Sequence, residues 1–145
     1  MIRRATIHDL EKISEINKIC LPENYDSITW MSIFLNPNAI FFIAYDEIDE
    51  TKIIAYCVGM GTPTNTTGYI VSFAVCPDYR KKGIGETLIK KTIKELSCTQ
   101  EVSLHVRVGN VIAQKLYQKL NFIQVSVEKQ YYRDGEDAYV MTMKI

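Results

Sequence analysis

A chain of 145 residues has room for one domain with a hydrophobic core, and it is too short for a second core. Seventeen lysine and arginine residues balance seventeen aspartate and glutamate residues, so the formal net charge is zero. Nucleic-acid-binding proteins ordinarily carry a pronounced basic excess, so this balance argues against that class of function. We therefore expect a single domain over residues 1–145 with no direct nucleic-acid partner.

The cysteine and histidine residues predict neither a disulfide framework nor a metal site. The cysteines form no CxxC pair, and the two histidines add no spacing typical of zinc ligands. The chain opens with the charged Met1-Ile2-Arg3-Arg4 and contains no secretion signal or apolar run of membrane length. We expect reduced thiols in a cytoplasmic protein that holds no metal and has no membrane partner. The cysteines are Cys20, Cys57, Cys76 and Cys98.

The N-terminal part of the chain is typical of a short strand followed by two helices. Residues 2–4 form the strand candidate, and Thr6 is a helix cap with Asp9 three residues on, a shortened capping box. Pro22 ends the first helix, because proline does not fit a helix interior, and residues 30–35 form a second, shorter helix. The first helix has a mostly apolar face of residues at helical spacing: Leu10, Ile13, Ile16, Asn17 and Cys20.

The rest of the chain alternates between strand-like and helix-like patterns, with polar, turn-rich connections. We expect strands at 39–45, 52–60 and 68–76, a helix at 83–96, a strand at 102–106, a helix at 111–120, and strands at 122–127 and 138–145. Antiparallel strands followed by strand–helix–strand–helix–strand predict an α/β fold of the α+β kind. Its mixed, mostly antiparallel sheet has about seven strands, with about four helices on its two faces.

The most informative stretch is an apolar strand that runs through a basic, glycine-containing loop, residues 80–85, directly into a helix. The start of a helix exposes unpaired backbone N–H groups and a positive dipole end, and glycine lets a phosphate approach them. A P-loop is excluded because Glu86 and Thr87 follow Gly85, and a dinucleotide fingerprint is excluded because Leu88 replaces its third glycine. The remaining alternative is a basic helix-capping turn on a solvated face.

The Arg-x-x-Gly-x-Gly pattern of residues 80–85 resembles the acetyl-CoA-binding motif of the GNAT acetyltransferase superfamily. A second segment, residues 103–122, resembles the other cofactor segment of that superfamily. The resemblance implies the GNAT fold, acetyl-CoA as cosubstrate, and a Tyr117 that protonates the departing thiolate; alternatively, Tyr117 only packs in the core. The implied cofactor contacts are Phe73, Ala74, Val75, Arg80, Lys81, Lys82, Gly83, Ile84, Gly85, Glu86, Asn110 and Tyr117.

Three segments narrow the resemblance to the catalytic subunit of the N-terminal acetyltransferase that modifies nascent chains, including its stand-alone archaeal relatives. They are residues 20–25, 103–107 and 131–139, the last reading Tyr-Tyr-Arg-Asp-Gly-Glu-Asp-Ala-Tyr. Bacterial RimI enzymes share the plan less closely. The resemblance implies transfer of acetyl to the α-amino group of protein N-termini in a channel between the first and last segments. Its implied peptide-binding residues are Leu21, Tyr25, Tyr131 and Tyr132. Singly, Asp134, Glu136 and Asp137 also fit a solvated acidic turn.

Three residues are candidates for the general base, and the sequence leaves the choice among them open. Glu23 matches a family position implicated in catalysis, and Tyr69 with His105 matches a pair that holds a catalytic water. His105 lies in an apolar strand, so a histidine satisfied within the core is an equal alternative. No cysteine matches a family nucleophile, which favours direct attack in a ternary complex.

Two other functions remain in view: acetylation of small amines such as polyamines, and a non-catalytic acyl-CoA-binding module. A peptide-backbone clamp at 131–139 has no obvious use on a polyamine, and the retained candidate catalytic residues argue against a binding module. The resemblance allows a ribosome or an auxiliary subunit as a partner, since relatives work either alone or attached to one.

Overall fold

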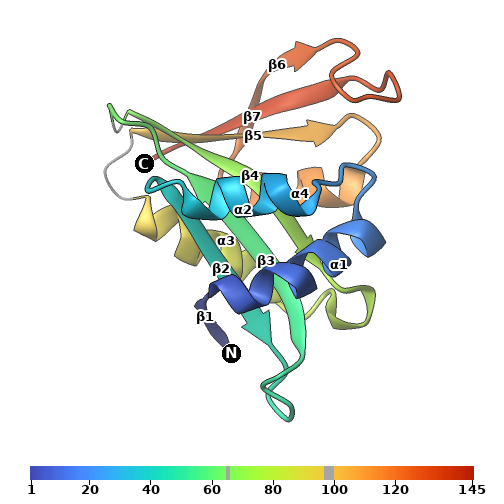
Figure 1. Ribbon diagram of the computed structural model, residues 1–145. Helices are drawn as coiled ribbons and strands as arrows, with labels where there is room; N and C mark the ends of the chain where they lie inside the picture. Colours follow the sequence, from blue (N-terminus) through green and yellow to red (C-terminus); the bar gives the residue numbers. More distant parts are fainter. Residues whose placement is uncertain (65, 97–99) are drawn as a thin grey trace.

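A computed structural model describes residues 1–64, 66–96 and 100–145 of the chain (Figure 1). Within them the strands are β1 (Ile2–Arg4), β2 (Ala39–Tyr45), β3 (Ile53–Met60), β4 (Thr67–Val75), β5 (Glu101–Arg107), β6 (Ile123–Glu128) and β7 (Ala138–Lys144). The helices are α1 (Leu10–Cys20), α2 (Ser27–Leu35), α3 (Ile84–Glu95) and α4 (Val111–Lys119), with short 3-10 turns at Ile7–Asp9 and Pro77–Tyr79. The predicted strands and helices are thus confirmed to within a few residues at their ends.

The strands form one seven-stranded sheet in the order β1-β2-β3-β4-β5-β7-β6. Every neighbouring pair is antiparallel except β4 and β5, which run parallel. The parallel pair is joined through α3, which lies behind the sheet in Figure 1. The predicted mixed, mostly antiparallel sheet is therefore confirmed.

Two helix starts differ from the sequence prediction, for reasons that lie in individual side chains. The carboxylate of Asp9 accepts the Thr6 N–H at 2.7 Å and pairs with Arg3, also at 2.7 Å. The predicted capping box of Thr6 and Asp9 is therefore confirmed, but it caps a 3-10 turn, so α1 itself begins only at Leu10. Helix α2 begins earlier than predicted because Asp26 caps it, accepting the Thr29 N–H at 2.7 Å.

Apolar side chains pack on both faces of the sheet. Helices α1 and α2 cover one face, where Trp30 meets the rings of Tyr56 and Phe41 edge-on at 5.9 and 6.3 Å. Helices α3 and α4 cover the other face around Leu88, Ile89 and further strand residues. No described helix has the length and apolarity to span a membrane. Cys20, Cys57 and Cys76 are free thiols, and Cys98 lies outside the described residues.

Strands β4 and β5 pair only at their beginnings. Their ladder joins Thr67–Tyr69 to Glu101–Ser103, although both strands continue well beyond it. In β4 the register against β3 shifts between Ser72 and Ile70, so Val71 is an extra, bulged residue. Meanwhile β5 stays paired with β7 along its whole length. The sheet consequently opens between β4 and β5, as Figure 1 shows, and this opening positions the site.

Candidate active site

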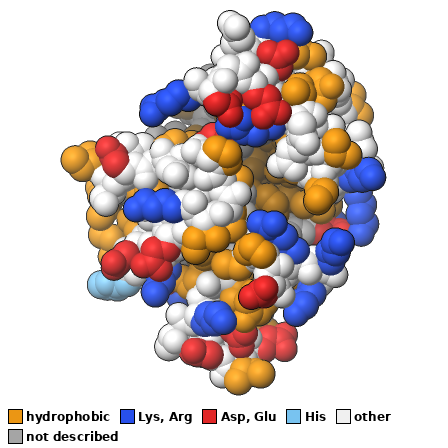
Figure 2. Space-filling model, turned by 90° about the vertical axis from the view of Figure 1, so that its right-hand side faces the viewer, with side chains coloured by type: hydrophobic (Ala, Val, Ile, Leu, Met, Phe, Trp, Pro, Cys, Tyr) orange, Lys and Arg blue, Asp and Glu red, His pale blue; other side chains and the backbone are white. Residues whose placement is uncertain are grey.

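A cavity of about 590 Å³ lies in the opening between β4 and β5. The loop between α1 and α2 and the segment between β6 and β7 form two further walls. Figure 2 shows a hollow lined by hydrophobic side chains near the middle of one face. Every predicted catalytic and peptide-binding residue lines the cavity: Leu21, Glu23, Tyr25, Tyr69, His105, Tyr117, Tyr131 and Tyr132. Of the predicted cofactor contacts, Phe73 and Asn110 also line it.

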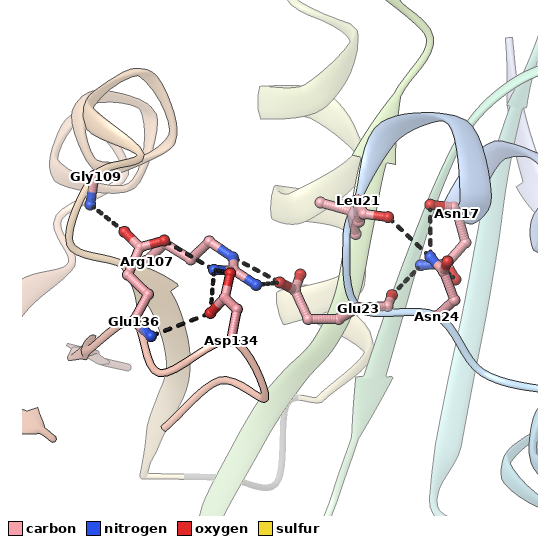
Figure 3. Close-up of polar contacts among 8 residues, drawn as sticks. All are labelled: Asn17, Leu21, Glu23, Asn24, Arg107, Gly109, Asp134 and Glu136. Atoms are coloured by element: carbon pink, nitrogen blue, oxygen red, sulfur yellow. Dashed lines mark hydrogen bonds and ion pairs between the residues drawn. The ribbon is translucent and has the colours of Figure 1, made fainter. Parts of the chain in front are cut away.

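One arginine of β5 joins the two walls of this cavity. Arg107 donates from Nε to Glu23 Oε1 at 2.7 Å, and from Nη1 to Asp134 and Glu136, both at 2.8 Å (Figure 3). Its guanidinium carbon also lies 4.1 Å from the ring centroid of Tyr132. The side chain is only 15% exposed, so these charges are partly shielded from water. Arg107 therefore sets the separation between two walls: the loop between α1 and α2, which carries Glu23 (the Glu23 loop), and the segment between β6 and β7, which carries residues 131–136 (the 131–136 hairpin).

Arg107 belongs to the segment 103–107 that resembles the family, but the resemblance assigns it no role. The sequence did contain an indication that Arg107 belongs to the site. Arg107 comes two residues after the candidate His105, and residues two apart in a strand point to the same face. Asp134 and Glu136 are not merely a solvated turn, since both bind Arg107 and Glu136 also accepts the Gly109 N–H at 2.9 Å. The Arg107 guanidinium lowers the pKa of Glu136, so its carboxylate stays charged. Asp137, by contrast, accepts the Gln130 N–H and closes the hairpin.

The Glu23 loop is fixed from its other side by a buried polar network. Asn17, fully buried in α1, donates to the Glu23 carbonyl at 2.9 Å and to the Tyr56 hydroxyl at 3.1 Å. The Tyr56 hydroxyl in turn lies 2.8 Å from Ser72 Oγ in β4. Asn24 donates to the Leu21 carbonyl at 2.8 Å, and Figure 3 shows this amide turned back into the loop. Backbone and carboxylate of Glu23 are thus held by different elements.

His105 lies two residues before Arg107 in β5, lines the same cavity and is stacked on an aromatic ring. Its imidazole is parallel to Tyr131, with an interplanar angle of 4° and centroids 4.1 Å apart. Tyr131 meets Tyr132 edge-on at 5.0 Å. Tyr69, 42% exposed on β4, lines the same cavity. The three candidates for the general base, Glu23, Tyr69 and His105, therefore line one cavity. Glu23 is hydrogen-bonded to Arg107, and His105 is stacked on Tyr131.

Tyr117 both packs in the core and lines the cavity, so the two predicted alternatives for this residue do not exclude one another. Its ring packs edge-on against Phe122 with centroids 5.9 Å apart and is 8% exposed, as a core residue would be. It also lines the cavity from α4, which Asn110 caps by accepting the Ala113 N–H at 3.2 Å. Burial raises the pKa of the Tyr117 phenol, so the group stays protonated and able to donate.

A separate cavity of about 280 Å³ lies at the N-terminus of α3. Gly83 precedes the helix in the left-handed conformation (φ 81°), and its carbonyl accepts the first helical bond from Thr87. The N–H groups of residues 84–86 therefore have no partner within the helix and face outward, as a phosphate requires. A Cβ built on Gly85 would lie 2.8 Å from Phe73 Cζ, so glycine lets the helix start close to β4. Arg80 and Lys81 supply positive charge.

Of the remaining cofactor candidates, Val75, Ile84 and Glu86 also line this cavity, whereas Lys82 and Ala74 do not. Lys90 and Lys119 neutralise Glu86 and hold the pKa of its carboxyl at about 2, so its backbone N–H is the group suited to a phosphate. Lys82 instead lies over the Tyr79 ring, 5.4 Å from its centroid. The Ala74 side chain is buried in the core under α1. Among the described residues no cluster of His, Cys, Asp or Glu is suited to a metal ion.

Residues 6–122 match the acetyltransferase (GNAT) family. The chain belongs to this family. Among curated proteins, this GNAT chain is 39% identical to the N-alpha-acetyltransferase of Sulfurisphaera tokodaii, covering 97% of the chain and 90% of that protein. It is 36% identical to the N-terminal acetyltransferase A complex catalytic subunit NAA10 of Arabidopsis thaliana, covering 97% and 75%. Arabidopsis thaliana NAA60 in complex with acetyl-CoA shares the GNAT fold, with a TM-score of 0.90, 22% identity, and coverage of 100% and 99%.

Proposed function

We propose that this chain is an N-terminal protein acetyltransferase, which transfers acetyl from acetyl-CoA to the α-amino group of protein N-termini. The observation that carries the proposal is the cavity between β4 and β5, whose two loop walls Arg107 holds at a fixed separation. Such a slot suits the extended end of a polypeptide. The names of the relatives support the same activity. We propose further that residues 1–145 form a single acetyltransferase domain.

The N-terminus of α3 suits the pyrophosphate of acetyl-CoA, because free N–H groups and the cations Arg80 and Lys81 meet there. Asn110 is suited to contact the pantetheine arm, since it lines the large cavity at the start of α4. Bound acetyl-CoA supplies the thioester carbonyl that the substrate amine attacks. Backbone N–H groups of residues 73–75 stabilise the charge on its oxygen, and Tyr117 protonates the leaving thiolate.

The peptide end is bound chiefly through its backbone, which every substrate shares. Burial raises the pKa of the Tyr132 phenol, so this hydroxyl remains a donor for a peptide carbonyl. Tyr131 lies beside it, and Leu21 with Tyr25 lines the pocket for the first side chain. A polyamine has no backbone carbonyl for such a donor, which is why small-amine acetylation is the weaker alternative.

An α-amine needs only a modest base, because at pH 7 about one in ten is uncharged, against roughly one lysine side chain in a few thousand. Glu23 Oε1 is occupied by Arg107, so this carboxylate is engaged in holding the walls together. We therefore infer that His105 accepts the proton, through a water that Tyr69 helps to hold. Both residues line the cavity and lie on neighbouring strands.

We propose that the protein works in the cytoplasm, where acetyl-CoA and nascent N-termini are both present. We propose a ribosome or an auxiliary subunit as a partner. The Arabidopsis relative is named as the catalytic subunit of a complex, which supports the auxiliary subunit.

The proposed activity can be tested with acetyl-CoA and short peptides that begin Ser, Ala, Met-Leu or Met-Glu. Free N-termini are expected to be acetylated, whereas a peptide with a blocked N-terminus and an internal lysine, or spermidine, is expected to react far more slowly. Mass spectrometry of the products locates the acetyl group. Equal turnover of the blocked peptide would refute the α-amine assignment, and tight CoA binding without any turnover would identify a binding module.

Tyr132→Phe is expected to weaken peptide binding alone. Removing one hydrogen bond costs about 0.5–1.5 kcal/mol, so KM for the peptide is expected to rise about 2- to 12-fold. CoA affinity is expected to stay unchanged, because Tyr132 does not line the cavity at α3. Steady-state kinetics and calorimetry with CoA measure the two effects. Tyr45→Phe, at the far end of β2, is the matched control, and a parallel fall in CoA affinity would contradict the clamp role.

A further inference from the structure

A carboxylate of the edge strand β6 faces the buried nitrogen of His105. Glu128 Oε1 lies 3.1 Å from His105 Nε2, although the two residues belong to strands separated by β7. The register explains the approach: His105 is opposite Val140 on one side of β7, and Ser126 is opposite Val140 on the other. Glu128 lies two residues beyond Ser126, so its side chain points to the same face as His105.

The surroundings of the imidazole make this contact specific. Nε2 is inaccessible to water and has no aligned hydrogen-bond partner among the described residues, so the nearby carboxylate oxygen is off the N–H direction. Tyr131 covers one face of the ring and fixes its plane. The Glu128 side chain is 48% exposed and free to rotate into alignment, as catalytic hydrogen bonds of ligand-free enzymes often do on substrate binding. Of the other charged residues that line the cavity, Glu23 and Arg107 are paired with one another, and Arg133 adds a further positive charge.

We propose that Glu128 is a positioning residue that keeps the His105 proton on Nε2 and leaves the Nδ1 lone pair free to accept a proton. This inference rests on the proposed function. The substrate ammonium gives one proton, through water, to Nδ1, and its freed electron pair forms the new bond to the thioester carbon. The carbon–sulfur bond breaks, and the thiolate leaves with a proton from Tyr117. The second proton of the acylated nitrogen passes through water to Tyr117 and restores its phenol. The Glu128 carboxylate stabilises the imidazolium of His105, which then gives the accepted proton to solvent.

Glu128→Gln removes the charge and keeps the shape, so kcat for peptide acetylation is expected to fall about tenfold while KM for peptide and for acetyl-CoA stays within about twofold. Glu128→Asp restores a carboxylate and is expected to recover part of kcat. In a His105→Phe background, Glu128→Gln is expected to have no further effect, because its partner is gone. Glu11→Gln, on exposed α1 surface, is the matched charge control with unchanged kinetics. An equal fall in both backgrounds would overturn the proposal.

A second measurement needs no turnover. The chain has two histidines, so imidazole ¹⁵N spectra contain two sets of signals, and His105→Phe assigns them. The neutral ring of His105 is expected to carry its proton on Nε2, with Nδ1 unprotonated; a proton on Nδ1 would overturn the proposal. If the wild-type protein acetylated no peptide, the proposed function would fail, while the spectra would still decide whether Glu128 sets the protonation of His105.

Discussion

Arg107→Ala is expected to lower kcat/KM for peptide acetylation by at least about a hundredfold, which corresponds to about 2.7 kcal/mol of transition-state stabilisation. Without the guanidinium, the carboxylates of Glu23, Asp134 and Glu136 face one another uncompensated across a partly shielded site. Their repulsion separates the two walls, so the peptide is no longer held in place. CoA affinity is expected to be retained, because Arg107 does not line the cavity at α3.

The shape of the arginine, and not its charge alone, carries this effect. Arg107→Lys keeps one positive charge but cannot donate to both walls from a planar fork, so an activity between wild type and Arg107→Ala is expected. Arg4→Ala is the matched control, since Arg4 forms an exposed pair with Glu95 far from the cavity. Thermal unfolding with and without CoA separates a local effect from loss of the fold. Unchanged peptide kinetics in Arg107→Ala would contradict the bridging role.

The elements of the fold were predictable because their signals are local. The strand 39–45 was predicted with its observed bounds, since its apolar run lies between an asparagine–proline turn and a polar loop. The start of α1 was not, because the 3-10 turn before it depends on Asp9 meeting Arg3 of a different element. The opening between β4 and β5 is likewise a property of pairing in the sheet, which hydrophobic periodicity does not report.

In the candidate site, too, the residues in local motifs were predictable, whereas contacts between distant residues were not. Motif residues such as Gly83, Gly85 and Tyr117 were found because the spacing of neighbours in the sequence identifies them. The partnership of Glu23 with Arg107 joins residues 84 positions apart, and no local pattern predicts it. The side chain of Lys82 was grouped with the phosphate loop by sequence alone, whereas the loop conformation turns it toward Tyr79.

Gly85→Val is expected to weaken CoA binding at least about tenfold and to leave the folded sheet intact. A Cβ at this position would meet Phe73 Cζ at 2.8 Å and Val75 Cγ2 at 3.5 Å, so the ring of Phe73 or the first turn of α3 must shift. The two methyl groups of valine need still more space, and the expected shift of the helix displaces the N–H groups of residues 84–86 from the position suited to a pyrophosphate. Calorimetry with CoA measures the loss. Thermal unfolding provides a second measure, because a ligand that binds only the folded state raises its stability.

A substitution at Gly83 is the control for Gly85→Val, because Gly83 is required for its backbone conformation and Gly85 for the close packing of α3 on β4. Its φ of 81° is left-handed, but nothing lies within 4 Å of a Cβ built there, so the constraint is conformational alone. Asparagine tolerates this conformation better than other residues with a side chain, so Gly83→Asn is expected to bind CoA within a few-fold of wild type. The constraint at Gly85 is the opposite: its backbone conformation is that of an ordinary helix, but Phe73 leaves no space for a side chain. CoA binding as tight in Gly85→Val as in wild type would mean that the start of α3 does not hold the cofactor.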